Sequence, residues 1–276
     1  MNTILKKLNQ APLYLVAIVL LLFTGLPFFI MVNTSFKGQM EFSSSPWALP
    51  ESFSFENYGL LFQTDFFRFF GNSLFVSIIS VVLVIVLSAM ASYPLARLKF
   101  KLNRPLFLLF MVGMMIPIHT TLIPIFLLTR SMGLYDTVWA LIGPYVAFAL
   151  PVSVVIFTQF MKELPKELEE SAKIDGCGHF RLFWKIIFPL LTPAISTVAI
   201  YNFIHIWNEF VFALVLTNSS ENATLPLGLR EFYGEFSVNV PGIMAALTLG
   251  SLPLLLVYFI AQEKIVKGLA AGSVKG

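Results

Sequence analysis

The sequence predicts an all-α integral membrane protein with six transmembrane helices. Hydrophobic residues make up 57% of the 276 positions and charged residues only 12%, and the charged residues leave long uncharged stretches between them. Soluble domains are about one quarter charged, and about 20 consecutive apolar residues cross a bilayer core as a helix. We therefore expect a multi-pass membrane protein. The small net charge of +3 gives no sign of nucleic-acid binding.

Six apolar stretches are long enough to be the predicted spans. They cover residues 13–32, 69–96, 105–129, 137–161 and 186–217, with the sixth inside 236–262. Only the fifth stretch contains an acidic residue well inside it, Glu209. The first stretch is longer than the apolar core of a signal peptide, and no small-x-small cleavage site follows it. We therefore expect a retained span there rather than a cleaved leader.

The positions of the basic residues orient these spans. An even number of spans puts both termini on one side, and 14 of the 18 lysines and arginines then fall on that side. The other four are Lys37, Arg68, Arg130 and Arg230. Because positive residues collect in cytoplasmic segments, both termini are expected in the cytoplasm. The outer segments, residues 33–68 and 218–240, are predicted to be ordered loops.

A polar segment, ELEESAKIDGCGHF at residues 167–180, lies on the predicted cytoplasmic side. Pro165 suits a helix start, the glutamates that follow complement the helix dipole, and Gly176 is a natural helix stop. A second helix is expected from Phe180. From composition alone the segment is either a solvated loop or a docking helix for a cytoplasmic partner.

Few polar groups lie inside the predicted spans. Glu209 falls toward the outer end of the fifth span, where His205 is four residues earlier on the same helix face and could pair with it. The pair is either an interfacial, helix-stabilising contact or part of a translocation pathway together with Asn208. His119 lies between two prolines of the third span and is expected to be a histidine satisfied within the bundle.

Catalytic and metal chemistry are not indicated. Three histidines without clustered carboxylates make a metal site improbable, and Cys177 is the only cysteine, which excludes an internal disulfide. The chain has no G-x-x-x-x-G-K-[ST] phosphate-binding loop. We therefore expect a non-catalytic membrane subunit that binds no cofactor itself. A proton-driven secondary transporter using Glu209 and the histidines is the alternative, although no internal repeat supports it.

The polar segment resembles the EAA loop of membrane subunits in binding-protein-dependent ABC importers. The matching positions are Glu170, Ser171, Ala172, Asp175, Gly176, Phe183, Ile186 and Phe188-Pro189. Further similar stretches are IPIHTTLIPIFLL (116–128), GLYDT (133–137), WNEFVFAL (207–214) and the ending GLAAGSVKG (268–276). Together they resemble the maltose-type carbohydrate group and its MalG-like permease subunit. Ser171, Phe188 and His119 depart from the usual pattern of that family.

The resemblance implies a fold and a set of domains. The fold would be the type I (MetI-like) ABC importer permease fold with cytoplasmic coupling helices. Residues 1–67 would hold the first span and outer loop, residues 68–263 the shared core with a coupling loop at about 162–188, and residues 264–276 a cytoplasmic tail. The localisation would be the cytoplasmic membrane of a prokaryote.

The resemblance also implies partners and site residues. The chain would form a heterodimer with a second homologous permease subunit, bind two ATPase subunits that hold the ATP, and receive a sugar or oligosaccharide from an extracytoplasmic sugar-binding protein. The implied ATPase-coupling residues are Glu170, Ser171, Ala172, Asp175, Gly176, Phe183 and Pro189. The tail would dock through Gly272, Val274, Lys275 and Gly276. His119, His205, Asn208 and Glu209 would line the pathway, while the partner permease would make most contacts with the sugar.

Overall fold

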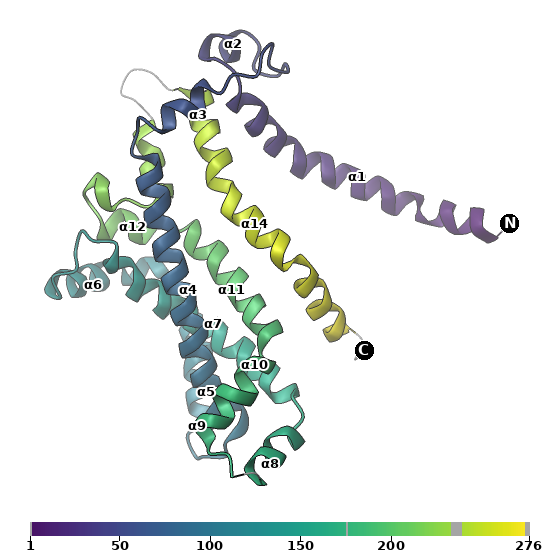
Figure 1. Cartoon of the computed structure of the whole chain (residues 1–276), viewed down its shortest axis with the longest axis vertical. Coiled ribbons are helices and arrows are strands. Elements are labelled where there is room, and N and C mark those ends of the chain that lie inside the picture. The colour runs from purple at the N-terminus through teal and green to yellow at the C-terminus, as the bar shows by residue number, and fades with distance from the viewer. Residues whose placement is uncertain (1, 175, 233–238, 274–276) are drawn as a thin grey trace. The chain divides into compact units, whose positions relative to one another are not determined.

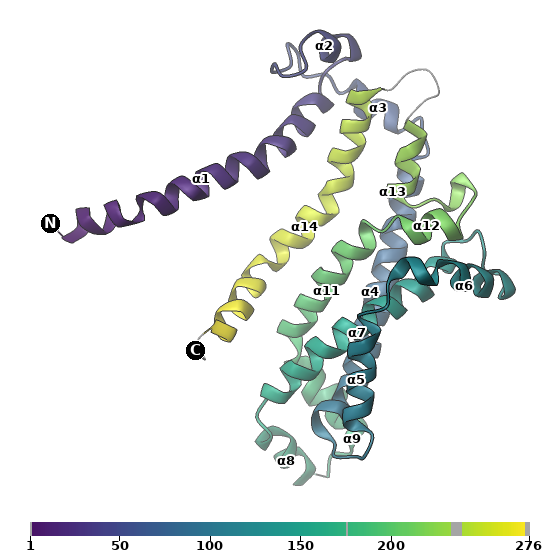
Figure 2. The same cartoon turned by 180° about the vertical axis from the view of Figure 1, so that it is seen from behind.

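The computed structural model describes residues 2–174, 176–232 and 239–273 and divides the chain into two units. One unit comprises Met1–Phe67 and Gly228–Leu252, and the other comprises Arg68–Leu227 and Pro253–Gly276. The described residues contain four helices that are long and apolar enough to cross a membrane, and six spans if each of two bent helix pairs counts as one. Figures 1 and 2 show the helices from opposite sides.

The first unit contains the first span and the segment that follows it. Its helices are α1 (Asn2–Ser35), α2 (Gln39–Ser44) and α3 (Glu56–Leu61), then η3 (Leu229–Phe232) and the first part of α14 (Val240–Ser273). The segment after α1 is ordered, as predicted. Asn57 donates hydrogen bonds to the carbonyl oxygens of Ser35 and Lys37, and the buried Lys37 ammonium donates to those of Ser45 and Pro46.

The second unit is a helix bundle in which α7 packs against both α5 and α11. Its larger helices are α4 (Phe66–Arg97), α5 (Asn103–Gly113), α6 (Ile118–Ser131), α7 (Trp139–Glu163) and α11 (Thr192–Trp207). Gly113 permits a close approach between α5 and α7, since a Cβ atom there would lie 3.1 Å from Cγ of Pro151. Short helices connect and extend these: α8 (Glu167–Ile174), α9 (His179–Leu182), η1 (Phe183–Ile187), α10 (Phe188–Leu190), α12 (Val211–Leu216), η2 (Ser220–Asn222) and α13 (Leu225–Gly228).

The third predicted span is not one straight helix. The stretch 105–129 is divided between α5 and α6, which meet at an angle of 98°. Pro117 occupies the N-cap of α6 in an extended conformation, with φ −68° and ψ 130°. Proline has no N–H to continue the helical hydrogen-bond ladder, so the chain turns there and starts a new helix.

The fifth predicted span also differs from the structure. Its first residues, from 186, belong to η1 and α10, and α11 begins only at Thr192, after a bend of 73°. The helix then ends at Trp207 instead of continuing past Glu209 to residue 217. The other four predicted spans are confirmed as parts of α1, α4, α7 and α14. The helix α1 begins at Asn2, well before residue 13, and α14 continues to Ser273, well past residue 262, whereas α4 and α7 end close to the predicted limits.

Candidate functional site

The polar segment forms the helix α8, with a start and a stop that follow from its sequence. Before the helix, the carbonyl oxygen of Lys166 accepts hydrogen bonds from the N–H groups of Glu169 and Glu170. At its end Gly176 takes the left-handed conformation, φ +78°, and the Cys177 N–H donates to the Ala172 carbonyl oxygen at 2.9 Å. This bond is the six-to-one contact of a Schellman motif. The predicted stop at Gly176 is confirmed.

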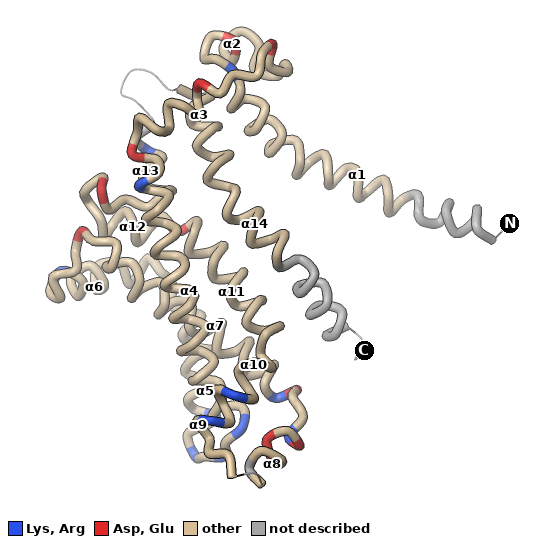
Figure 3. The backbone as a smooth tube through the Cα atoms, viewed as in Figure 1, with Lys and Arg blue, Asp and Glu red and all other residues tan. Residues whose placement is uncertain are grey.

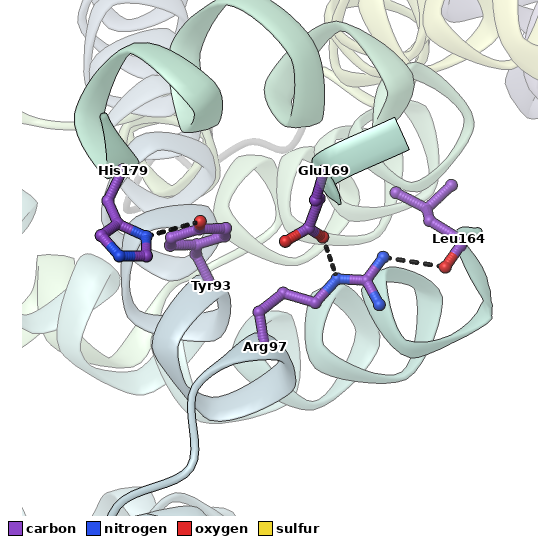
Figure 4. A network of polar contacts seen from close by, with 5 residues as sticks. All are labelled: Tyr93, Arg97, Leu164, Glu169 and His179. Atoms are coloured by element: carbon purple, nitrogen blue, oxygen red, sulfur yellow. Dashed lines mark hydrogen bonds and ion pairs between the residues drawn. The ribbon is translucent and has the colours of Figure 1, made fainter. Parts of the chain in front are cut away.

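An ion pair fixes α8 to the last turn of α4. Arg97 Nε lies 2.5 Å from Glu169 Oε1, and the two side chains are only 3% and 7% exposed (Figure 4). Neither of these two atoms has another partner among the described residues. The same guanidinium donates from Nη2 to the Leu164 carbonyl oxygen at 2.9 Å, at the end of α7. Arg97 thus joins α4, the end of α7 and α8.

A second contact joins α4 to the chain that follows α8. The Tyr93 hydroxyl and His179 Nδ1 are 3.3 Å apart (Figure 4), and the Tyr93 ring also packs against the ring of Phe183. Tyr93 and Arg97 are four residues apart and therefore share one face of α4. This face contacts the chain before, within and after α8, so we expect a force applied to α8 to reach α4 directly.

Apolar side chains are exposed on α8 and on the short helix α9 that follows it. Leu168 and Ile174 of α8 are 43% and 86% exposed, and Phe180 of α9 is 76% exposed. Large exposed apolar side chains beside charged ones are typical of a protein–protein contact. Sequence reasoning placed Leu168, Glu169 and Phe180 in this helix-turn but gave none of them a docking or ion-pair role, and it did not connect Arg97 to the segment. The alternation of buried Glu169 and Ala172 with exposed Leu168 is the helical period that could have indicated them.

The predicted coupling residues divide between the exposed and the buried side of this region. Glu170, Ser171, Gly176 and Pro189 are exposed, whereas Ala172 and Phe183 are buried. Asp175 lies outside the described residues. Of the predicted tail residues, Gly272 belongs to α14, and Val274, Lys275 and Gly276 lie outside the described residues.

Two of the predicted pathway residues line one cavity between α7 and α11. This cavity has a volume of about 250 Å³, and both His205 and Glu209 lie in its wall. His119 on α6 and Asn208 do not line it. Asn208 instead donates to the Ile204 carbonyl oxygen of its own helix at 2.8 Å.

The predicted pairing of His205 with Glu209 is wrong. The Glu209 carboxylate accepts hydrogen bonds from the Tyr145 hydroxyl at 2.6 Å and from the Phe212 N–H at 2.9 Å. No ion pair with His205 occurs in the part of the chain that the structure describes. Because α11 has ended, Glu209 is placed to satisfy an N–H of the first turn of α12, which a helix leaves unpaired. The His205 ring instead lies 4.4 Å from that of Tyr201, centroid to centroid.

A third polar cluster holds the segment that follows α12. Asp136, in the turn before α7, accepts hydrogen bonds from the Asn218 N–H, the Ser219 N–H and the Ser219 hydroxyl at 2.8–2.9 Å. Asn222 donates to the Asp136 carbonyl oxygen at 2.7 Å. Burial favours the neutral carboxyl, but these hydrogen bonds outweigh it and lower the pKa of Asp136. Asp136 has φ 57°, a conformation that aspartate tolerates better than most residues.

Comparison with known proteins shows that this bundle of bent helices is a membrane permease subunit, and it also defines the family. Residues 85–270 match the family described as the binding-protein-dependent transport system inner membrane component. The chain is 51% identical over 256 residues to a putative ABC transporter permease, ORF2, of Caldicellulosiruptor sp. (strain Rt8B.4), covering 92% of this chain and 93% of that one. This protein belongs to the family of inner-membrane components of binding-protein-dependent transport systems.

Two further relatives extend the comparison. The melibiose/raffinose/stachyose import permease MelC of Bacillus subtilis (strain 168) is 32% identical over 253 residues, which are 91% of each chain. A chain of the bacterial ABC transporter that imports the acidic polysaccharide alginate has a similar fold, with a TM-score of 0.79, 21% identity and coverage of 95% and 96%. The predicted permease fold is confirmed, and the protein is a multi-pass membrane protein.

Proposed function

We propose that this chain is the permease subunit through which an ATP-driven importer moves a sugar or oligosaccharide across the cytoplasmic membrane. The family and the raffinose-type permease MelC support the sugar as cargo. The proposed partners are a second permease subunit, two ATPase subunits that bind the ATP, and an extracytoplasmic sugar-binding protein.

The observation that carries this proposal is the two-sided environment of α8. One side is fixed to α4 by the buried Arg97–Glu169 pair, and the exposed side presents Leu168 and Ile174, with Phe180 of α9 close by in the sequence. A helix that is rigidly held on one side and partly apolar on the other suits the transfer of motion from a bound protein. We infer that the ATPase subunit binds this exposed side and moves α8 and α4 together.

The distribution of charge supports a cytoplasmic position for α8. In the second unit the lysines and arginines gather where α5, α8 and α9 lie (Figure 3). Positive residues are retained on the cytoplasmic side of membranes. The soluble ATPase would then reach α8 from the cytoplasm, and both chain termini would lie on that side.

A proton-driven transporter is less well supported. Glu209, the carboxylate that such a mechanism would use, is held by Tyr145 and by a backbone N–H of α12. These contacts give Glu209 a structural role as the cap of the first turn of α12.

The proposal is tested by purifying this chain after co-expression with a candidate ATPase, second permease and binding protein. We expect ATPase to co-purify and the binding protein to stimulate ATP hydrolysis. Ile174→Asp should reduce ATPase association about tenfold, because a lost apolar anchor typically costs about 1.4 kcal/mol or more. Leu102→Asp is the matched control, since Leu102 is 61% exposed in the α4–α5 connection and should leave association unchanged.

Two outcomes would contradict the proposal. If no candidate ATPase binds the wild-type chain, the protein is not the permease of an ATP-driven importer. If wild type and Ile174→Asp bind the ATPase equally well, the exposed side of α8 is not the docking surface. The tail residues Gly272, Val274, Lys275 and Gly276 are proposed as a second contact. Deleting residues 272–276 should then weaken ATPase association without affecting membrane insertion.

A further inference from the structure

The cavity between α7 and α11 combines aromatic rings with a few polar groups. Tyr145 and Phe148 approach it from α7, Tyr201, Asn202 and His205 from α11, and Glu209 from the turn beyond. A mostly apolar wall with a small number of placed polar groups is typical of binding sites for small molecules. Inside a membrane bundle, ionisable and polar residues also mark a substrate path by default.

The lining residues of each helix lie on one face of that helix, so α7 and α11 each form one wall of the cavity. On α11, Tyr201, His205 and Glu209 recur every four residues, so they follow one helix face into the turn. On α7, Tyr145, Phe148 and Val152 recur at intervals of three and four. The two faces meet at the buried Asn202, which donates to the Ser153 hydroxyl on α7 at 3.0 Å. The cavity therefore has a fixed floor and is not a gap between loosely packed helices.

The polar groups still have unused hydrogen-bonding capacity. Asn202 uses its amide group to donate to Ser153 and to the Val198 carbonyl oxygen, which leaves its carbonyl oxygen as an acceptor. The Glu209 carboxylate accepts from the Tyr145 hydroxyl and from the N–H groups of Phe212 and Ala213, which leaves about one of its roughly four acceptor positions. His205 and Tyr201 are exposed and add groups that both donate and accept. Sugar hydroxyls, which donate and accept, match this set.

The volume of the cavity and the charges in its wall restrict the class of ligand further. The volume of about 250 Å³ is below the roughly 300–1,000 Å³ of pockets that enclose drug-sized molecules, so it suits one sugar ring. No lysine or arginine is among the described residues that line it, and Glu209 supplies a carboxylate. An anionic sugar ring would lie near the Glu209 carboxylate with no lysine or arginine to offset the repulsion, so its binding is disfavoured.

We propose that this cavity is a saccharide site of the permease itself and holds one uncharged sugar ring between Tyr201 and the aromatic face of α7. This inference rests on the proposed function and deepens it. The chain then contacts its cargo directly, in contrast to the resemblance, which implies that the partner permease makes most of the contacts. It also sets this chain apart from an importer of an acidic polysaccharide.

The test uses the complete importer purified without its binding protein, so that any bound sugar lies in the membrane subunits. Saturation-transfer difference NMR, which detects weak binding, is recorded with raffinose and with an alginate trisaccharide as probes. We expect a raffinose signal and a much weaker alginate signal. Tyr201→Ala should weaken raffinose binding about tenfold, the upper end of a lost aromatic contact. Tyr258→Ala is the matched control, since Tyr258 is 53% exposed on α14 and does not line the cavity.

Uptake by the importer reconstituted with its binding protein separates failure of this site from failure of the proposed function. Absence of raffinose, maltotriose and diacetylchitobiose uptake by wild type would remove the proposed function and this site with it. Uptake of one of these sugars by wild type, without an NMR signal from that same sugar, would overturn the site alone. So would a signal that Tyr201→Ala and His205→Ala both leave unchanged, which would place the sugar in the partner subunit. Equal signals from raffinose and the alginate trisaccharide would overturn the proposed selection for uncharged sugars.

Discussion

Arg97 and Glu169 form a buried ion pair between the end of α4 and the first turn of α8, with Nε and Oε1 2.5 Å apart. Both side chains are almost fully shielded, so the pair is not one of the exposed contacts that contribute little to stability. Together with the Tyr93–His179 contact, this ion pair attaches α8 and the chain after it to the last turns of α4 (Figure 4). The proposed ATPase-docking helix is therefore connected directly to a transmembrane helix.

Removing one member of this pair is expected to destabilise the protein strongly. Glu169→Leu leaves the Arg97 guanidinium buried without its partner, which typically costs about 3–5 kcal/mol. We expect a lower thermal unfolding temperature in detergent and loss of binding-protein-stimulated ATP hydrolysis. Glu170→Leu is the control, because Glu170 is exposed and its loss should leave the unfolding temperature unchanged.

A double variant tests whether the unpaired charge causes this loss of stability. Replacing a buried ion pair by apolar residues of similar volume is often neutral for stability. Arg97→Met combined with Glu169→Leu should therefore regain most of the unfolding temperature lost by Glu169→Leu alone. If the single variant unfolds at the wild-type temperature, the pair does not fix α8 to α4.

Gly176 is expected to act through its backbone conformation. Its φ of +78° suits glycine, and a Cβ atom there would meet no atom within 4 Å. Gly176→Leu therefore introduces strain without a clash, about 1–2 kcal/mol for a left-handed L-residue. We expect it to disturb the end of α8 and to lower stimulated ATP hydrolysis, while insertion into the membrane stays normal.

Asparagine at the same position provides a matched control. Asparagine adopts the left-handed conformation more readily than leucine, so Gly176→Asn should retain most of the stimulated activity. Equal activities of the two variants, measured at equal amounts of inserted protein, would show that the conformation of Gly176 does not matter for coupling.

Much of the fold could be predicted from the sequence because membrane spans depend on composition over long windows. The stretches later found in α1, α4, α7 and α14 are uncharged over a bilayer thickness, and only a helix satisfies their backbone groups in lipid. The bends were not predictable in the same way. A proline such as Pro117 is compatible with a kinked but continuous helix as well as with a break, and neighbouring helices decide between them.

The candidate site was only partly predictable. The glycine stop of α8 follows from local conformation, so Gly176 was identified from the sequence. The Arg97–Glu169 pair joins residues far apart along the chain, and nothing in the local pattern of either residue identifies its partner. Glu209 shows the opposite problem, since its spacing from His205 suggested a pair on one helix. The helix ends at Trp207, and the carboxylate turns to α12 and Tyr145 instead.

Asp136 is expected to make the attachment of the segment after α12 dependent on pH. Its pKa is lowered in the folded protein because its hydrogen bonds to Asn218 and Ser219 outweigh the effect of burial. Its contribution to stability is thus fully present above the ordinary aspartate pKa of about 3.9. It is lost as the pH falls through the lower, folded-state pKa.

The measurement is hydrogen exchange of the 217–223 backbone in detergent-solubilised protein between pH 6 and pH 3, corrected for the intrinsic pH dependence of exchange. Wild type should lose protection there at the acid end. Asp136→Asn tolerates the same backbone conformation but cannot ionise, so its protection should be lower at pH 6 and nearly independent of pH. A wild-type profile that matches that of Asp136→Asn would show that the carboxylate does not hold this segment.

Asn57 is expected to organise the segment between α1 and α4 in the first unit. Its buried side chain donates to the carbonyl oxygens of Ser35 and Lys37 at 2.9 and 2.8 Å. Asn57→Leu leaves these two acceptors unpaired, at about 1–3 kcal/mol for each that stays buried. We expect faster proteolysis of residues 36–55 in the variant, whereas Gln63→Leu, at an exposed position, should be cleaved at the wild-type rate. Unchanged proteolysis of Asn57→Leu would mean that the aromatic contacts of Phe36 with Phe53, Phe55 and Tyr58 are sufficient to order this segment.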